Sequence, residues 1–451
     1  MSNFKKHKEI LILILLFIIF TPIFLTPWVH HNDGAGYYSY VRSAFIDGDL
    51  DLKNEKDFFS AKFAVSSIQE DESTGVYFSQ YPIGVPLLWS PFFALGHGIA
   101  NLSGSVLNGY STPYVYMVNL GSAIFGFLGL LLIYSFCSNF FRKSVVLLST
   151  VTFWLSSSVF YYMYFEGTMS HAISMFSVAL FIYWWYKTLK NRTFFQWFVL
   201  GILSALMIMV RYQNGFFMIL PLYFSIKTYH SLVKIRSRRV LNLFYKNIFF
   251  LFSLLIGLIP QFIVLNYQHG TYFSALTNYQ TSINYVAGSY NWIRVLFSAD
   301  HGLFVWTPVI LLSFLGILLA IKRFHAQKHL MVAFLLAFCL QLFFVASISA
   351  WNGAQSYGHR MFLNCSLIFV FGFCHLINLI YKRYGWKIPL LMSFVLICWN
   401  FNLMVQYGFR LIPSDGAINF WNVLKNTFTK LPHKLFAFVK IFMGSRGDLT
   451  S

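Results

Sequence analysis

The sequence predicts an all-α polytopic membrane protein with about eleven transmembrane helices. Three observations support this fold class: the composition, the length of the apolar runs and the placement of the charges. Of 451 residues, 57% are hydrophobic and 10% are charged. Many apolar runs reach the roughly 17 to 25 residues that cross a hydrocarbon core of about 30 Å. A soluble domain has no use for so many such runs, whereas a helix satisfies its own backbone hydrogen bonds in lipid.

The first apolar run follows Lys5, Lys6 and Lys8 and continues to about residue 28. It is too long for the apolar part of a signal peptide, and no small-x-small cleavage site follows it. We therefore expect an uncleaved first helix. Because lysines and arginines favour the cytoplasmic side, the N-terminus is expected in the cytoplasm.

The other lysines and arginines gather in short breaks between apolar runs, which the positive-inside rule places in the cytoplasm. Acidic or uncharged breaks are then expected outside. The basic breaks are 142–143, 187–192, 227–246, 322–329 and 381–387. The outer breaks are 30–80, 165–171, 267–301 and 349–360. Eleven crossings satisfy this alternation and put the C-terminus outside; they lie near residues 10–28, 112–138, 145–163, 171–187, 194–211, 213–227, 248–266, 302–321, 330–348, 361–381 and 388–407.

Two apolar segments differ from plain crossings. Residues 81–102 contain Pro82, Pro86 and Pro91, so we expect a bent helix that lies at the outer interface or re-enters it. The short pair at 194–227 is interrupted by the sequence RYQNG. Broken helices of this kind line cavities in membrane proteins.

The C-terminal segment, residues 413–451, mixes lysine with phenylalanine, tryptophan and leucine. This pattern is typical of an amphipathic helix in the membrane interface, and a twelfth crossing stays open. We therefore expect a transmembrane domain over residues 1–412, followed by an amphipathic tail. The outer loop of that domain, residues 29–111, is expected to carry interfacial or re-entrant helices.

The charge distribution excludes nucleic-acid binding. The formal net charge is +19, but residues 33–80 hold nine of the fourteen carboxylates and four of the 33 lysines and arginines. The positive excess lies in breaks between apolar runs, not in a solvated basic domain. It therefore indicates topology, with the acidic segment exported. The five cysteines lie inside apolar runs without metal-ligand spacing, which is typical of small core residues.

Asp33 lies about five residues beyond the first helix, at the outer membrane face. Desolvation at that depth raises a carboxyl pKa unless a cation or metal offsets it, and such a carboxylate suits a general base. A loop aspartate that only faces water is the alternative. Aromatic residues and Arg42 follow at helical spacing, which predicts an interfacial helix. The sequence DGDLD at 47–51 is similar to calcium-binding oxygen clusters without the rest of an EF-hand loop, so a divalent cation and a solvated loop both stay open.

Four further motifs follow in order: YPIGVPLLWSPF, YFEGTMSHAISMF, HGLFVWTPV and WNGAQSYGHRMF. With the first helix and the loop that opens on Asp33, they resemble bacterial members of the GT-C superfamily, from the first helix to about residue 380. These are polytopic glycosyltransferases that use polyprenyl-phosphate-linked sugars. They are related to the protein O-mannosyltransferases and the lipid A aminoarabinose transferases. The protein O-mannosyltransferases carry an Asp-Glu pair where this chain has Asp33 and Gly34.

The resemblance implies that Asp33 is the catalytic carboxylate. A sugar that leaves a lipid phosphate needs an acceptor stripped of its proton and cations that stabilise the departing phosphate. The cationic candidates for binding the donor phosphate are Arg211, Arg360, His359, Arg42 and His301. Arg211 and Arg360 lie at helix ends, where snorkelling to the lipid headgroups is the alternative. An arginine there is costly unless paired, and its planar fork suits phosphate oxygens.

Glu166 is the only acid between residues 72 and 300. It is a second catalytic candidate that would orient the acceptor or pair with an arginine, and a solvent-facing loop acid is the alternative. Asp300, His171 and His31 are candidates for contacting the acceptor or a metal. Asp300 could equally cap a helix.

These observations predict an integral membrane glycosyltransferase of the bacterial inner, or cytoplasmic, membrane with its active site on the outer face. It would move a sugar, with inversion, from a polyprenyl-phosphate donor to an unknown glycan, lipid or protein acceptor. A transporter or flippase for a lipid-linked sugar shares the broken helices and basic pocket. A non-enzymatic component of envelope polysaccharide assembly is the third class. No cofactor is firmly indicated, and a divalent cation stays open.

Overall fold

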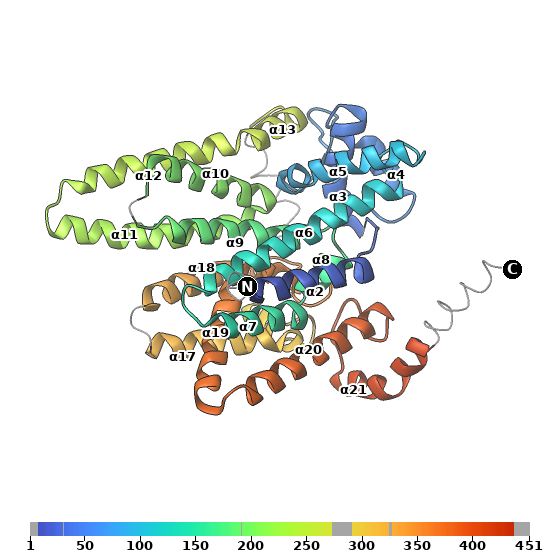
Figure 1. The fold of residues 1–451 in the computed structure, drawn as a ribbon. Coiled ribbons are helices and arrows are strands. Elements are labelled where there is room, and N and C mark those ends of the chain that lie inside the picture. Colours follow the sequence, from blue (N-terminus) through green and yellow to red (C-terminus); the bar gives the residue numbers. More distant parts are fainter. Residues whose placement is uncertain (1–7, 30, 191, 273–290, 324–326, 437–451) are drawn as a thin grey trace.

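The computed structural model describes residues 8–29, 31–190, 192–272, 291–323 and 327–436. Within these ranges nearly all elements are helices (Figure 1). His30 and residues 273–290, which belong to expected outer breaks, lie outside the described residues, as do residues 437–451 of the expected tail. The helices of the bundle and its connections are α2 (Lys8–Phe24), α6 (Thr112–Cys137), α7 (Lys143–Ser156), α8 (Val159–Tyr164), α9 (His171–Lys187), α10 (Phe194–Val210), η2 (Tyr212–Met218), α11 (Ile219–Lys234), α12 (Arg239–Gly257), α13 (Ile259–His269), α15 (Trp292–Phe297), α16 (Leu303–Trp306), α17 (Pro308–Arg323), α18 (Lys328–Ala346), η4 (Arg360–Cys365), α19 (Ser366–Tyr384), α20 (Lys387–Gly408) and α21 (Phe420–Phe428).

Five of the described helical stretches are long and apolar enough to cross a membrane: α6, α12, α18, α20 and Arg360–Tyr384. Most other expected crossings correspond to shorter helices or to helices in two pieces. The expected crossing at 145–163, for example, is divided between α7 and α8. The all-α polytopic class is thereby confirmed, while helix length alone identifies five of the eleven expected crossings.

Close helix packing holds the bundle together where small residues allow it. A Cβ atom added to Gly316 of α17 would lie 2.0 Å from the carbonyl oxygen of Gly372 in α19. Such close backbone approach is how helices associate in membranes, where lipid removes the usual hydrophobic driving force between them.

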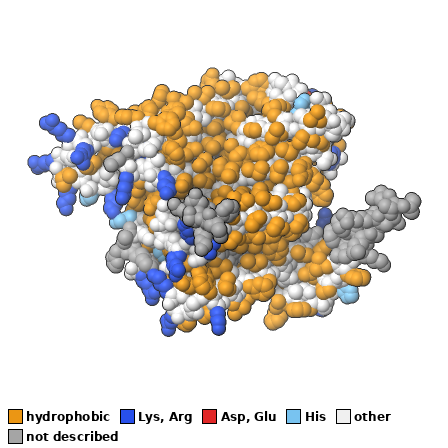
Figure 2. Space-filling view, viewed as in Figure 1, with side chains coloured by type: hydrophobic (Ala, Val, Ile, Leu, Met, Phe, Trp, Pro, Cys, Tyr) orange, Lys and Arg blue, Asp and Glu red, His pale blue; other side chains and the backbone are white. Residues whose placement is uncertain are grey.

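The basic break expected at 227–246 is largely helical. α11 continues to Lys234 and α12 begins at Arg239, so only a four-residue turn joins them, and the hairpin extends from the rest of the bundle (Figure 1). Lysine, arginine and leucine are good helix formers, which explains why the charged segment continues both helices. On the face drawn in Figure 2, lysines and arginines gather toward the end where this hairpin lies, and hydrophobic side chains cover the middle.

The first outer loop forms a folded cap of short elements. These are α3 (His31–Arg42), the π-helical turn η1 (Ser43–Asp47), α4 (Lys53–Ser60), the strands β1 (Ile68–Glu70) and β2 (Tyr77–Ser79), and α5 (Gly84–Leu102). The strands pair antiparallel, with Ile68 opposite Ser79. His269 at the end of α13 forms a hydrogen bond with Asp71, in the turn between β1 and β2. Short helices therefore occur in this loop and the cap is tied to the bundle, while their place at the membrane interface stays a prediction.

Within the segment 81–102, residues Gly84–Leu102 form one helix, α5, which includes Pro91. It packs against the N-terminal half of α6, where the indole Nε1 of Trp89 donates to Ser122 Oγ at 2.8 Å. A Cβ atom on Gly84 would lie 2.4 Å from the backbone of Met209 at the end of α10. The sequence before α5 is therefore held against the break between α10 and η2, which brings Tyr81 toward the bundle.

The described part of the tail contains one amphipathic helix, α21. Val423 and Asn426 of α21 are buried, whereas Trp421 and Phe428 are exposed. Gln406 of α20 donates to the Val423 carbonyl at 3.0 Å. At about 1.5 Å per residue, α21 itself is too short to span a membrane.

Candidate active site

Asp33 lies in the first turn of α3 and is held by partners from distant segments. Its Oδ2 atom forms an ion pair with Nη1 of Arg360 at 2.9 Å. Its Oδ1 atom accepts a hydrogen bond from the Tyr81 hydroxyl at 2.7 Å. The Asp33 side chain keeps 24% of its surface exposed, against 12% for Arg360. The carboxylate is therefore fixed by the protein but still accessible to a ligand.

Opposing effects set the pKa of Asp33. Burial disfavours the charged carboxylate, but Arg360, the Tyr81 hydroxyl and the charge of Arg211 together outweigh burial and lower the pKa. The expectation that desolvation would raise this pKa unless a cation offset it is thus resolved by Arg360. Asp33 is ionised at neutral pH and ready to accept a proton or a hydrogen bond.

Arg360 reaches Asp33 from an irregular stretch of backbone. Gly358 has a φ of +60°, in the left-handed region that glycine tolerates, and the 3-10 turn η4 begins two residues later. The same Nη1 atom lies 3.1 Å from the sulfur of Met169. Irregular backbone within a membrane protein is tolerated where it is buried in protein or lines a cavity.

Tyr81 is itself positioned by α3. Its ring stacks on that of Tyr37, with centroids 4.5 Å apart and planes at 17°. A Cβ atom on Gly36 would lie 2.8 Å from the Tyr81 ring, so the stack depends on a glycine there. Burial and the neighbouring Asp33 charge raise the pKa of Tyr81, which keeps its hydroxyl protonated and donating.

Gly34 brings the loop between α8 and α9 against α3. A Cβ atom at this position would lie 2.7 Å from Thr168 Oγ1 and 3.3 Å from Thr168 Cβ. The second acid of an Asp-Glu pair would meet the same obstruction. In this chain a second carboxyl group comes instead from Glu166, in the same loop as Thr168.

Glu166 is a buried carboxyl group, 3% exposed. Oε1 accepts a hydrogen bond from the Tyr161 hydroxyl at 3.1 Å. Within the part of the chain that the structure describes, Oε2 has no hydrogen-bond partner. Burial raises the pKa of Glu166 to about 7, against the opposing charge of Arg360. Two carboxyl groups with pKa values displaced in opposite directions are typical of acid–base sites.

Arg211 contributes a second guanidinium to the same region. It ends α10 in an extended conformation, with φ −156° and ψ 129°, in the break before η2. Its Nη1 atom donates to Nδ1 of His171, which is 3% exposed, at 2.6 Å. With its amide oxygen turned toward Arg211, Gln213 accepts from Nη2 and Nε at 2.8 Å. Among the described residues no carboxylate lies within ion-pair distance of Arg211.

Neutral amides hold the two helix breaks together beneath these charges. Asn214 of η2 accepts at Oδ1 from Ser174 and from Asn364 of η4, at 3.0 Å each. Asn364 also donates to Gln341 of α18 at 3.2 Å. Buried networks of this kind fix the geometry of the groups that they support.

A neighbouring polar group consists of Asp300, His301 and His359. It is connected to the site because His359 directly precedes Arg360 in the chain. Nδ1 of His301 lies 2.9 Å from Oδ1 of Asp300, and Asn352 donates to Oδ2 at 3.0 Å. The His301 ring stacks on Trp306, with centroids 4.6 Å apart. Burial and the nearby His301 and Arg360 lower the pKa of His359 to about 3, so this ring is neutral. A neutral, buried His359 suits hydrogen bonding better than phosphate neutralisation.

The remaining candidates have other surroundings. Arg42 forms ion pairs with Asp47 and, at 2.8 Å, with the buried Glu55, which fits a role in holding the cap together. His31 begins α3 in the left-handed region, at φ 48°. Burial lowers the pKa of His31, with Asp33 opposing and Arg360 adding to the effect. The described residues contain no group of three or more acids, histidines or cysteines arranged to hold a metal ion.

The site brings together Asp33, Glu166, Arg211, Arg360 and His171 of the sequence candidates. Sequence reasoning did not single out Tyr81, Tyr37, Asn214 or Asn364. Tyr81 lies within a motif that suggested the superfamily, and Asn214 lies in the interrupted pair of helices. Their positions in the sequence were the available signals for a functional role. Neutral polar and aromatic side chains are common in this chain, however, so their residue type alone does not indicate a functional site.

Fold and site together define a class first: a polytopic helical membrane protein in which Asp33 of the folded cap pairs with Arg360 of the bundle. Residues 115–263 match the family model described as dolichyl-phosphate-mannose-protein mannosyltransferase. The match includes Glu166, His171 and Arg211 but neither Asp33 nor Arg360.

Among solved structures, the fold is similar to that of ArnT from Cupriavidus metallidurans, whose crystal structure is described as bound to undecaprenyl phosphate. The likeness has a TM-score of 0.53 and 9% sequence identity, and covers 90% of this chain and 71% of that one. No curated protein matches the sequence. The predicted resemblance to the GT-C superfamily is thus confirmed at the level of fold.

Proposed function

We propose that the chain is an integral membrane glycosyltransferase that moves a sugar from a polyprenyl-phosphate-linked donor to an acceptor. The observation that carries this proposal is the combination of a partly exposed Asp33 carboxylate with Arg360 and Arg211. Arg211 has a histidine and an amide for its polar neighbours rather than an acid. The site therefore offers positive charge to an anionic group beside a carboxylate that can take a proton.

The comparisons support the donor class. A relative in fold binds undecaprenyl phosphate, and the matched family is described by a dolichyl-phosphate sugar. Both descriptions name a sugar carrier or a sugar on a polyprenyl-type phosphate. Since arginine forks suit phosphate oxygens in two-point contact, Arg360 and Arg211 are the residues that we assign to the donor phosphate.

In the reaction, an acceptor hydroxyl or amine attacks the anomeric carbon as the bond from that carbon to the phosphate oxygen breaks. The acceptor proton passes to Asp33, and polyprenyl phosphate leaves with the bonding electron pair. Arg360 and Arg211 stabilise the charge on the leaving phosphate. A single direct displacement inverts the configuration at the anomeric carbon.

Donor binding would also tune the base. In the structure the charge of Arg360 lowers the pKa of Asp33. A phosphate that draws Arg360 toward itself removes part of this offset, while burial, which opposes the charge, remains. The pKa of Asp33 then rises and the carboxylate becomes a stronger base at the stage when it is needed.

The same proposal puts the site at the outer face of the bacterial cytoplasmic membrane. Its support is the charge distribution along the sequence, where acids are concentrated in the cap that carries Asp33. Basic residues gather instead toward the end where the α11–α12 hairpin lies (Figure 2). The acceptor, whether glycan, lipid or protein, would approach through this cap.

The test is transfer by membranes that contain wild type, Asp33→Asn or Asp57→Asn at equal protein levels. Asp57 is an exposed acid of the same loop, so it matches the charge change. The donor probes are radiolabelled mannose and aminoarabinose on undecaprenyl phosphate, and label is followed into lipid, protein and polysaccharide fractions. Asp33→Asn should lower transfer at least ~10²-fold, as loss of a positioned general base does, and Asp57→Asn should not.

The other outcomes distinguish the rival classes. Normal transfer by Asp33→Asn would remove Asp33 from the mechanism and make Glu166 the next base to substitute. Wild-type protein that moves labelled lipid across the bilayer without transferring its sugar to any fraction would instead identify a flippase. No effect of wild type on either process, with both donors, would favour the non-enzymatic class.

A further inference from the structure

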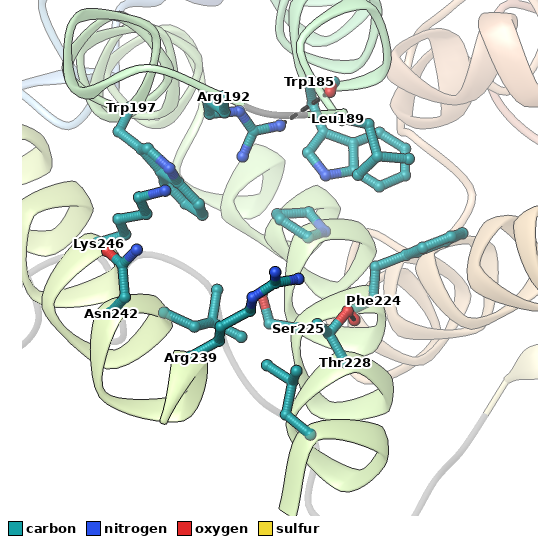
Figure 3. Close-up of a pocket in the computed structure, with 13 residues that line it drawn as sticks. Trp185, Leu189, Arg192, Trp197, Phe224, Ser225, Thr228, Arg239, Asn242 and Lys246 are labelled. Carbon is teal, nitrogen blue, oxygen red and sulfur yellow. Dashed lines mark hydrogen bonds between the residues drawn. The ribbon is translucent and has the colours of Figure 1, made fainter. Parts of the chain in front are cut away.

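A second charged site lies at the opposite end of the molecule from Asp33. A cavity of about 720 Å³ opens between the end of α9, the start of α10 and the α11–α12 hairpin. Figure 3 shows Arg192, Arg239 and Lys246 around it, together with Trp185 and Trp197. In Figure 1 this hairpin and the cap formed by α3, α4 and α5 lie at opposite ends of the fold. The proposed transfer reaction gives this cavity no role.

Its charge is uncompensated by the residues that surround it. Three of the thirteen lining residues are basic and none is acidic. The sequence contains no acid between Glu166 and Asp300, so the four helices that enclose the cavity supply none. Among the described residues, Arg192, Arg239 and Lys246 take part in no ion pair. Clustered cations without acids repel one another, and an anionic ligand would relieve that repulsion.

Arg192 is held as a fixed donor rather than as a mobile surface charge. It is 7% exposed, and its guanidinium lies 4.4 Å from the centre of the Trp197 ring. Nε donates to Thr188 Oγ1 and Nη2 to the Trp185 carbonyl, each at 2.9 Å. Neither bond uses Nη1, which remains for a ligand. Burial lowers the pKa of Arg192 to about 10, so the group stays charged at neutral pH.

An apolar groove continues from this basic cavity. The groove has a volume of about 390 Å³ and shares Trp197, Pro221 and Ser225 with the cavity. It then passes along Phe250 and Leu251 of α12 to Leu340 of α18. A basic cavity that leads into an apolar groove matches a molecule with an anionic head and a hydrocarbon chain. A free phosphate would fill the basic cavity alone and leave the groove without a ligand.

We propose that this cavity binds an anionic phospholipid, with its phosphate at Arg192, Arg239 and Lys246 and an acyl chain in the groove along α12. Basic pockets between transmembrane helices are known to bind acidic headgroups on the cytoplasmic side. The bound lipid would hold the α11–α12 hairpin against α9 and α10. Because Arg211 directly follows the last residue of α10, the lipid would also steady the helix next to one of the donor-site arginines.

The experiment measures lipid binding to the purified full chain in detergent by native mass spectrometry. Phosphatidylglycerol and phosphatidylcholine are titrated separately onto wild type, Arg239→Gln/Lys246→Gln and Arg236→Gln/Arg238→Gln. The last variant removes two arginines from the turn of the same hairpin, and neither residue lines the cavity. The first variant keeps the buried Arg192, so its folding is least at risk.

Wild type should retain phosphatidylglycerol in preference to phosphatidylcholine. The cavity variant should lose roughly tenfold or more of that affinity, since each basic residue near a membrane surface contributes about a factor of five. The turn variant should also lose affinity for phosphatidylglycerol, but the change in the logarithm of its affinity should be less than half of that in the cavity variant. Equal binding of the two lipids by wild type, or equal losses in the two variants, would overturn the proposal. Displacement of phosphatidylglycerol by millimolar inorganic phosphate would also overturn it, because the groove would then have no part in binding.

Discussion

The buried Glu166 provides a quantitative test of the site's electrostatics. Replacing it with glutamine keeps the shape of the side chain and mimics the protonated carboxyl group. In the folded protein the pKa of Glu166 is raised from 4.5 to about 7. Since one pKa unit corresponds to about 1.36 kcal/mol, the full difference is about 3 kcal/mol, an upper value for the effect on unfolding free energy.

The sign follows from proton binding. Between about pH 4.5 and pH 7 the folded state holds the Glu166 proton more tightly than the unfolded state does. The stabilisation is therefore complete below pH 4.5 and is lost as the pH rises through 7. Glutamine has no such dependence. Near pH 5 the unfolding free energy of Glu166→Gln should be close to that of wild type. At pH 8 the Glu166→Gln protein should be the more stable of the two.

The assay is thermal unfolding in detergent micelles, followed by tryptophan fluorescence from pH 5 to pH 8. Glu72→Gln, at an exposed position in the β1–β2 turn, makes the same change of charge and is the control. Its unfolding profile should run parallel to that of wild type. Parallel profiles for Glu166→Gln and wild type, or a less stable Glu166→Gln at pH 8, would refute the buried, unpaired carboxyl group inferred here.

Three other predictions address the arginines and the topology. Arg211→Lys and Arg360→Lys should each weaken binding of undecaprenyl phosphate although the charge is kept, because the planar guanidinium fork is lost. A lipid-binding titration measures the affinity, and an unchanged value would reassign that residue to membrane anchoring. Arg42→Ala should lower the free energy of unfolding by about 3 kcal/mol or more, because it leaves a buried carboxylate unpaired. The affinity for the donor should stay near that of wild type. The reverse pattern would make Arg42 a donor ligand. A cysteine at Ser66 should react with a membrane-impermeant thiol reagent in intact cells and one at Ser237 should not, and the opposite labelling would invert the orientation.

Much of the fold was predictable because membrane proteins obey simple constraints of length and charge. The apolar runs gave the helical class, and the residues at the helix ends stood out because ionisable groups are rare there. Asp33, Glu166 and Arg360 were predicted one by one on this basis. Their meeting in space, through the Asp33–Arg360 ion pair, was implied by a resemblance of motif order and not by any local pattern.

Contacts between neutral or locally paired side chains were not predictable in the same way. Tyr81 lies 48 residues from Asp33, and its hydroxyl contact depends on how the cap folds back over α3. Asn214 and Asn364 are 150 residues apart and carry no charge that would mark them. Arg42 was expected among the donor ligands because of its sign and its side of the membrane. Its ion pairs with Asp47 and Glu55 are a tertiary feature of the cap.

The account as a whole depends on where a polyprenyl phosphate binds. The most direct measurement is a cryo-electron microscopy structure of the full chain in lipid nanodiscs with undecaprenyl phosphate. We expect the phosphate within about 3 Å of the Arg211 and Arg360 guanidinium nitrogens, beside Asp33. A phosphate bound instead in the cavity of Arg192, Arg239 and Lys246, with nothing at the Asp33 cluster, would contradict the proposed active site.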